Sequence, residues 1–323
     1  MTMVEHRTVT AGGPRLHIAE EGEGPLVLLL HGFPECWYNW RHQFTPLAGA
    51  GYHVVAPDQR GYARSDRPAA VEEYTTLHLV GDVIGLIREL GAQQAVVIGH
   101  DLGGMVAWST ALMRPDVIRG VVGLSVPPPQ RGPVPPLQAM RERFGGQFYW
   151  NYFQTPGVAD GELAKDPHAT FRRVMYGLSG DTPHSDPPVE PLVPPGKGFL
   201  DLFEDPEELP AWLTEADIDT LATEFTEAGF TSALNWYRNF DRNWQLTAPW
   251  EGAQYRMPGR YITGDRDLVY GFPGIDQLLP ALPTLHPTVG PAHILPGCGH
   301  WIAEERPGEV NAALLEFCGA LNS

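Results

Sequence analysis

The stretch VVIGHDLGG at residues 96–104 decides the fold. Its apolar start is typical of a buried strand, and Leu102–Met113 is typical of a helix that ends before Pro115. The G-x-D-x-G between them predicts a nucleophile elbow, with Asp101 in the place of the usual serine. Such a turn strains the backbone and crowds it against neighbouring chain, so it needs small flanking residues. An ordinary helix with an aspartate N-cap has the same local pattern, so the rest of the chain must distinguish the two.

Short apolar runs bounded by turn residues recur along the chain and predict buried parallel strands. They are Leu26–Leu30, His53–Ala56, Ala95–Ile98, Val121–Leu124, Tyr261–Thr263 and His293–Leu295. Apolar residues from Leu77 to Leu90 share one helical face, and Gly91 follows them as a C-cap glycine. A closing helix is expected at Val310–Leu321. Alternating strands and helices predict an α/β fold, a mostly parallel, doubly wound sheet with helices on both faces.

The alternation stops between Pro127 and Thr247. This segment begins with VPPPQRGPVPP, has a second proline-rich stretch at Thr182–Lys197, and otherwise contains aromatic-rich helical patterns without a clear strand. It therefore cannot belong to the sheet, and we expect an inserted α-helical domain. The predicted division is a core of residues 1–130 and 246–323, with a lid of residues 131–245. The sheet pattern resumes at Arg260.

Composition limits the partners and the compartment. The 323 residues carry 22 Lys+Arg and 39 Asp+Glu, a net charge of −17, which disfavours nucleic acids and anionic membranes as partners. With 43% hydrophobic and 19% charged residues, the chain is globular. Cys36, Cys298 and Cys318 lack C-x-x-C spacing, so we expect free thiols. The start of the chain shows no apolar signal segment, so we expect a cytoplasmic protein, and a homodimer is left open.

Polar residues follow three of the other predicted strands. They are HGFPE at residues 31–35, Asp265 and Asp267, and His300. Ligands of open α/β sheets bind at the carboxyl ends of the strands, and the order nucleophile, acid, histidine is that of the α/β-hydrolases. Aspartate is ionised at neutral pH and can attack a saturated carbon directly. The pattern thus favours Asp101 as a nucleophile over an N-cap.

Seven motifs together resemble the epoxide hydrolases of the α/β-hydrolase superfamily. They are HGFPECWYNWRHQ (31–43), DQRGYARSD (58–66), GHDLGG (99–104), YFQTPGVAD (152–160), NWYRN (235–239), GDRD (264–267) and GCGHW (297–301). The resemblance spans nearly the whole chain and implies a helical lid inserted after the sixth strand, in agreement with the break at Pro127. Two positions depart from the family: Leu102 stands where tryptophan is usual, and Ala63 replaces a glycine. We expect Leu102 to alter the pocket wall, so the family's substrate preferences are not carried over.

The resemblance implies a two-step reaction through an ester of Asp101. His300 would deprotonate the hydrolytic water, and Asp267, which the family's G-x-x-D pattern selects over Asp265, would orient the imidazole. Backbone N–H groups of Phe33 and Leu102 would form the oxyanion hole.

The leaving group separates neighbouring chemistries. Opening an epoxide produces an alkoxide, which needs a proton donor. Tyr149 and Tyr237 resemble the family's pair of lid phenols, which can supply that proton. Glu35 is a candidate for positioning the water. Trp150 and Trp236 are among the aromatic residues expected to line an apolar tunnel, although packing is the default role of each.

The expected function is hydrolysis of a small apolar epoxide to a vicinal diol, without cofactor or metal. One alternative is a haloalkane or haloacid dehalogenase with the same Asp–His pair, although the side chain of Leu102 has no N–H to offer a halide. The other is a non-catalytic ligand-binding homologue, which the complete set of catalytic groups disfavours.

Overall fold

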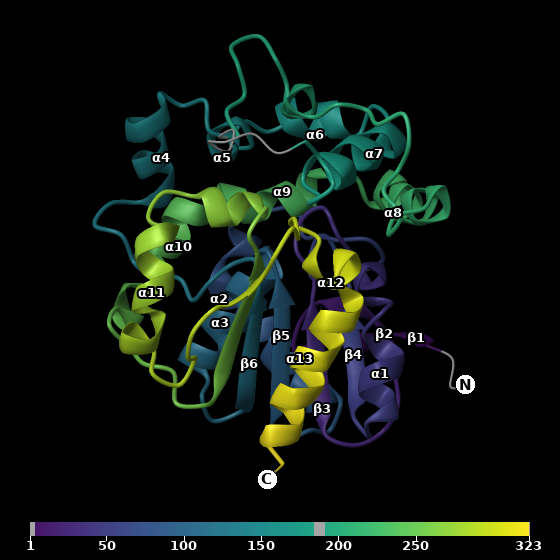
Figure 1. The fold of residues 1–323 in the computed structure, drawn as a ribbon, viewed down its shortest axis with the longest axis vertical. Helices are drawn as coiled ribbons and strands as arrows, with labels where there is room; N and C mark the ends of the chain where they lie inside the picture. Colours follow the sequence, from purple (N-terminus) through teal and green to yellow (C-terminus); the bar gives the residue numbers. More distant parts are fainter. Residues whose placement is uncertain (1–3, 184–190, 323) are drawn as a thin grey trace.

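The computed structural model describes residues 4–183 and 191–322, and the strands found there form one sheet. The strands are β1 (Glu5–Thr10), β2 (Arg15–Glu21), β3 (Leu26–Leu30), β4 (His53–Pro57), β5 (Ala95–His100), β6 (Ile118–Leu124), β7 (Gly259–Gly264) and β8 (His293–Leu295). Their order is β1-β2-β4-β3-β5-β6-β7-β8, and β3 to β8 pair in parallel (Figure 1). The six predicted strands and their parallel arrangement are confirmed.

Sequence analysis did not foresee β1 and β2, which extend the sheet in antiparallel fashion beside β4. In β1 only Val9 is buried, and the rest of EHRTVT is exposed. An edge strand of this kind buries too little apolar surface to show the continuous hydrophobic run of a central parallel strand.

Side chains of β3 alternate between two apolar cores, one on each face of the sheet. Leu28 and Leu30 join the core beneath α2 (Thr76–Glu89) and α3 (Leu102–Met113), while Leu29 faces α1 (Phe44–Gly49) and α13 (Pro307–Ala320). Figure 1 shows α13 lying across one face of the sheet. Helices on both faces were predicted, and the bounds of α3 agree with the prediction at both ends.

The predicted buried face of α2 needs one correction. Leu77 is 40% exposed. The buried stripe of the helix is centred on Val83 and includes Leu79 and Leu86. Leu77 lies more than a quarter turn around the helix from Val83, outside this stripe. Gly91 follows the helix with φ +72°, the conformation expected of a glycine at that end.

The segment between β6 and β7 is helical and covers one end of the sheet (Figure 1). Its helices are α4 (Pro136–Phe144), α5 (Tyr149–Tyr152), α6 (Val158–Leu163), α7 (Pro167–Gly177), α8 (Glu215–Ala228), α9 (Thr231–Arg238) and α10 (Phe240–Leu246). Within its described part, strand-like pairing is limited to an isolated bridge between Phe148 and Leu192. The proline-rich stretch Thr182–Lys197 lies in part outside the described residues. An insertion after the sixth strand is what the resemblance implied.

The remaining helices are short or lie near the C-terminus. They are α11 (Ile275–Leu285) and α12 (Ile302–Glu305), with 3-10 helices at Trp37–Trp40, Val71–Tyr74, Phe199–Leu202, Ala248–Trp250 and Leu268–Gly271. Over the ranges 4–183 and 191–322, none of the helices combines the length and apolar character needed to cross a membrane. The three cysteines are buried free thiols, as expected.

Candidate active site

Asp101 stands at the turn between β5 and α3 in a strained conformation, with φ 49° and ψ −121°. A methyl group on Gly99 would lie 2.1 Å from the carbonyl oxygen of Gly103, and one on Gly103 would lie 2.1 Å from that of Leu30. Neither position has room for a side chain, because real Cβ atoms do not approach so closely. The elbow geometry that the sequence predicted for residues 99–103 is therefore present.

Backbone N–H groups face the Asp101 carboxylate. The N–H of Phe33, in the loop after β3, donates to Oδ1 at 3.0 Å, and the N–H of Leu102 also hydrogen-bonds this carboxylate. Burial raises the pKa of Asp101, and the positive charges of His300 and His100 offset only part of that rise. The two N–H donors occupy the positions expected for an oxyanion hole.

His300 lies between two carboxylates. Its Nδ1 is 3.0 Å from Oδ1 of Asp267, and its Nε2 is 3.9 Å from Oδ2 of Asp101, too far for a direct hydrogen bond. Burial alone would lower the pKa of His300, but the charge and hydrogen bond of Asp267 raise it overall. Asp265 is exposed and accepts the N–H of Gly297 at 2.7 Å. Of the two candidate acids, only Asp267 contacts the imidazole.

Ser125 also contacts the imidazole and was not found by sequence reasoning. Its Oγ is 3.2 Å from Nδ1 of His300. Burial raises the pKa of Asp267, but the charge and hydrogen bond of His300, followed by a hydrogen bond with the Ser125 side chain, lower it overall. The residue follows β6 with φ +70°, and its carbonyl accepts the Tyr261 hydroxyl at 2.8 Å. A serine one residue past a predicted strand was the available signal.

A buried ion pair lies next to Asp101 and was also missed. His100 Nδ1 is 2.7 Å from Oε1 of Glu35, and His100 Nε2 is 2.7 Å from the carbonyl oxygen of His300. Both partners are acceptors, so both ring nitrogens carry protons and the imidazole is a cation. Burial lowers the pKa of His100, but Glu35, Asp101 and Asp267 raise it overall to about 9. The second oxygen of Glu35 accepts the N–H of Gly32, which fixes the loop that carries Phe33.

Two lid phenols face the same pocket. Tyr149, on α5, and Tyr237, on α9, are 7% and 3% exposed, and their ring centroids are 6.1 Å apart. Burial, followed by the negative charge of Asp101, raises the pKa of both phenols. The hydroxyl protons therefore stay in place across the neutral pH range, as a proton donor requires.

The pocket that joins these groups is small, and a larger cavity adjoins it. Asp101, His300 and the two phenols line a cavity of about 20 Å³ whose other walls are apolar. A neighbouring cavity of about 470 Å³ shares Leu178, Pro191, Phe203 and Leu268 with it. Other lid aromatic residues line the two cavities: Phe148 and Tyr176 the larger one, and Phe153 the smaller one.

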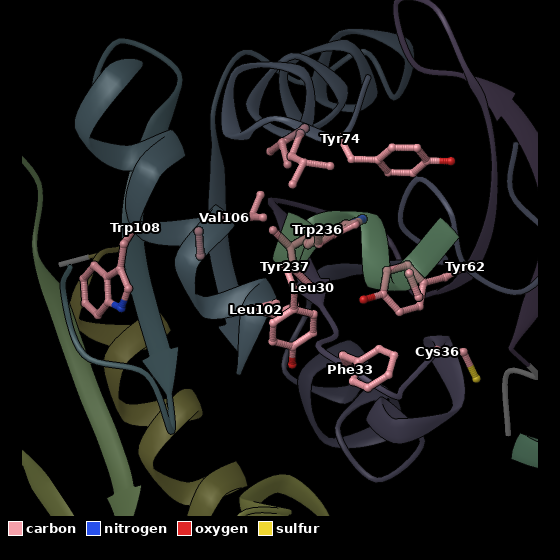
Figure 2. Close-up of a cluster of buried hydrophobic side chains, with 14 of the residues drawn as sticks. Leu30, Phe33, Cys36, Tyr62, Tyr74, Leu102, Val106, Trp108, Trp236 and Tyr237 are labelled. Atoms are coloured by element: carbon pink, nitrogen blue, oxygen red, sulfur yellow. The ribbon is translucent and has the colours of Figure 1, made fainter. Parts of the chain in front are cut away.

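Three side chains lie elsewhere than expected. Trp236 donates its indole N–H to the carbonyl of Arg60 at 3.0 Å, and it points away from the hydroxyl of Tyr237 (Figure 2). Trp150 lines neither of these two cavities, and its indole N–H hydrogen-bonds the phenol oxygen of Tyr149. The side chain of Leu102 lines a separate small cavity with Trp236 and does not line the catalytic pocket. The expectation that Leu102 alters the wall of that pocket is therefore wrong. Successive helical residues point about 100° apart, which puts the side chains of residues 236 and 237 on different sides of α9.

A parallel sheet that presents an acid at its elbow and a histidine after its last strand is the architecture of the α/β-hydrolases. The family described as alpha/beta hydrolase fold matches residues 25–174. Epoxide hydrolase A of Mycobacterium tuberculosis is 46% identical over 318 residues, covering 98% of this chain and 97% of that protein. Epoxide hydrolase 3 of Siraitia grosvenorii is 42% identical over 325 residues, covering 98% and 99%.

Solved structures agree with these relatives. The crystal structure of epoxide hydrolase A from Mycobacterium thermoresistibile has a TM-score of 0.91 and 45% identity, and the match covers 98% of both chains. An epoxide hydrolase from an endophytic Streptomyces has a TM-score of 0.92 and 44% identity, covering 99% of this chain and 96% of that one. The chain therefore belongs to the epoxide hydrolase family of the α/β-hydrolases, and the predicted fold, family and hydrolase class are confirmed.

Proposed function

We propose that this enzyme adds water to a small apolar epoxide through an ester of Asp101 and releases a vicinal diol. One observation carries the proposal: a buried carboxylate, a histidine and two protonated phenols line the same pocket. The names of the relatives support the reaction, and the arrangement of these groups supports the mechanism.

In the first step, a carboxylate oxygen of Asp101 forms a bond to one epoxide carbon while the ring C–O bond breaks. The electron pair goes to the epoxide oxygen, which takes a proton from Tyr149 or Tyr237. Because two phenols are available, one can donate the proton while the other hydrogen-bonds the same oxygen. The pocket is nearly filled by its own side chains, so we propose that a larger substituent of the epoxide lies in the adjoining cavity.

In the second step, water attacks the carboxyl carbon of the Asp101 ester, and His300 accepts the proton of that water. The resulting oxyanion is bound by the N–H groups of Phe33 and Leu102. Asp267 holds the imidazole with Nδ1 protonated, so that Nε2 faces Asp101 and is free to act as the base. Expulsion of the alkoxide, which takes the proton held by His300, gives the diol and leaves Asp101 as a carboxylic acid. Return of that proton to the phenolate formed in the first step restores both Asp101 and the tyrosine.

We assign supporting roles to Glu35 and to the lid. Glu35 holds the oxyanion loop through the N–H of Gly32 and keeps His100 charged, so its effect on the water is indirect. Residues 131–245 would form the lid that supplies both phenols, over a core of residues 1–130 and 246–323. The buried reduced thiols support a cytoplasmic location.

A single turnover in ¹⁸O-labelled water tests the mechanism. The label is expected in the carboxylate of Asp101, whereas the new diol oxygen comes from the unlabelled enzyme. Label found only in the diol would mean direct attack by water and would remove Asp101 as the nucleophile. Parallel incubation with a haloalkane tests the dehalogenase alternative, for which halide release without diol formation from an epoxide is the diagnostic result.

A further inference from the structure

Glu305 folds back over the loop that carries His300. Its Oε2 accepts the N–H of Gly299 at 2.8 Å, and its Oε1 accepts the N–H of Trp301 at 3.1 Å. One carboxylate thus binds the residues immediately before and after the histidine. Glu305 is 6% exposed and does not line the catalytic pocket.

The same carboxylate holds the lid. Oε2 of Glu305 also accepts the N–H of Gly180 at 2.9 Å, in the segment that follows α7. The backbone N–H of His300 donates to the carbonyl of Leu178 at 2.8 Å. The indole N–H of Trp301 donates to the carbonyl of Met175 at 2.7 Å. The histidine loop and the lid segment are therefore fastened to each other on both sides of His300.

The backbones of the histidine loop and the lid segment are in close contact at Gly180 and Gly299. A methyl group on Gly299 would lie 2.2 Å from the backbone nitrogen of Gly180, and one on Gly180 would lie 2.3 Å from the carbonyl oxygen of Gly297. Close approach of the two backbones lets the N–H groups of Gly180 and Gly299 share one carboxylate oxygen. A small shift of Glu305 would therefore move both segments.

Hydrogen bonds from backbone N–H groups, rather than an ion pair, hold this charge. Among the described residues, no cationic side chain forms a salt bridge with Glu305. Burial raises the pKa of Glu305, the three N–H groups oppose that rise, and the nearby charge of Asp181 adds to it. Burying a carboxylate without a cation costs free energy, and the three N–H donors offset that cost. A side chain that replaces Glu305 must accept hydrogen bonds from the same three N–H groups.

We propose that Glu305 is a positioning residue that sets His300 for the hydrolytic step by fastening its loop to the lid at Gly180. The inference rests on the proposed function, because it takes His300 as the base that activates water. Glu305→Gln is the sharpest test. The amide group replaces one acceptor oxygen with a donor, so at least one of the three N–H groups loses its partner while the size of the side chain is kept.

The experiment measures the two half-reactions separately in single turnovers and follows backbone hydrogen exchange. We expect Glu305→Gln to slow hydrolysis of the alkyl-enzyme about tenfold and to leave its formation within about twofold of the parent rate. Exchange should become faster in peptides that contain residues 178–180 and 299–301. Glu309→Gln, an exposed carboxylate in the first turn of α13, is the control and should change neither measurement.

Three outcomes decide between the explanations. Unchanged hydrolysis and unchanged exchange in Glu305→Gln would overturn the proposal. Equal slowing of both half-reactions, together with a lower Tm, would overturn it in favour of a purely structural role. A parent enzyme that forms no alkyl-enzyme would refute the proposed function instead, and the exchange result would still report whether Glu305 fastens the two segments.

Discussion

Replacing Tyr149 and Tyr237 by phenylalanine, singly and together, tests the feature that distinguishes epoxide opening from neighbouring reactions. Each change keeps the ring and removes only the hydroxyl. The ring of Tyr237 packs against Phe33 and Phe153 at centroid distances of 5.5 and 5.0 Å, and these contacts are retained. We therefore expect Tyr237→Phe to keep a Tm close to that of the parent, and Tyr149→Phe to fold with a slightly lower Tm because the Trp150 side chain loses its hydrogen-bond partner.

The magnitude follows from the burial of the two phenols. A hydrogen bond to a charged group contributes about 1.5–3 kcal/mol, which corresponds to a rate factor of roughly 10–150 for each donor. Both phenols are buried, which favours the upper part of this range because water cannot replace the lost donor. The double variant should slow alkylation by about 10²–10⁴, the range of general-acid effects. The two single effects should not add, because both donors act on one oxygen.

The assay is rapid mixing with a limiting amount of an aromatic epoxide, followed by mass measurement of the intact alkyl-enzyme. Tyr152→Phe provides a matched control on the same helix, since that hydroxyl donates to Glu162 at 2.8 Å and does not line the catalytic pocket. Hydrolysis of alkyl-enzyme that has already formed should change much less than its formation. A double variant that forms alkyl-enzyme at the parent rate would remove both phenols from the mechanism.

Three further predictions concern the carboxylates and the histidine. His300→Gln should still form the ester but stop at about one equivalent of alkyl-enzyme, and a folded variant that forms no ester would show that the histidine acts earlier. Asp267→Asn should slow hydrolysis by about 10²–10⁴ through the wrong imidazole tautomer. Because Asp267 raises the pKa of His300, that variant should also move the acid limb of hydrolysis to lower pH, and an unmoved limb in its pH profile would contradict this. Burial raises the pKa of Asp101, so alkylation should be lost as pH falls through a value above that of an ordinary aspartate, as single turnovers at different pH can show.

Much of the fold could be predicted because its central strands are buried on both faces. Continuous apolar runs such as Leu26–Leu30 follow from that burial, and the small residues around Asp101 follow from the crowded elbow. The exposed strand β1 gave no comparable signal, since only Val9 in it is buried. Helical periodicity located α2 but placed Leu77 on the wrong face, because an apolar residue near a helix end can be left exposed.

The candidate site was predictable where a residue's role depends on its own place in a motif. Asp101 and His300 each follow a strand, so topology alone brings them to one end of the sheet. The roles of His100 and Glu305 depend instead on contacts with distant segments, at Glu35 and at Gly180. A single sequence contains no record of such pairs, so neither role can be predicted from it.

The charges around His300 explain how one site can serve both proposed steps. In the free enzyme the negative charges of Asp267 and Asp101 raise the pKa of His300, while the cationic His100 lowers it. Alkylation converts Asp101 to a neutral ester, so one of the two charges that favour the protonated imidazole disappears. The pKa of His300 must then fall, and its neutral form, which accepts the proton of water, becomes more populated. Formation of the ester thus prepares the base that removes it, and the cation at His100, fixed by Glu35, acts in the same direction.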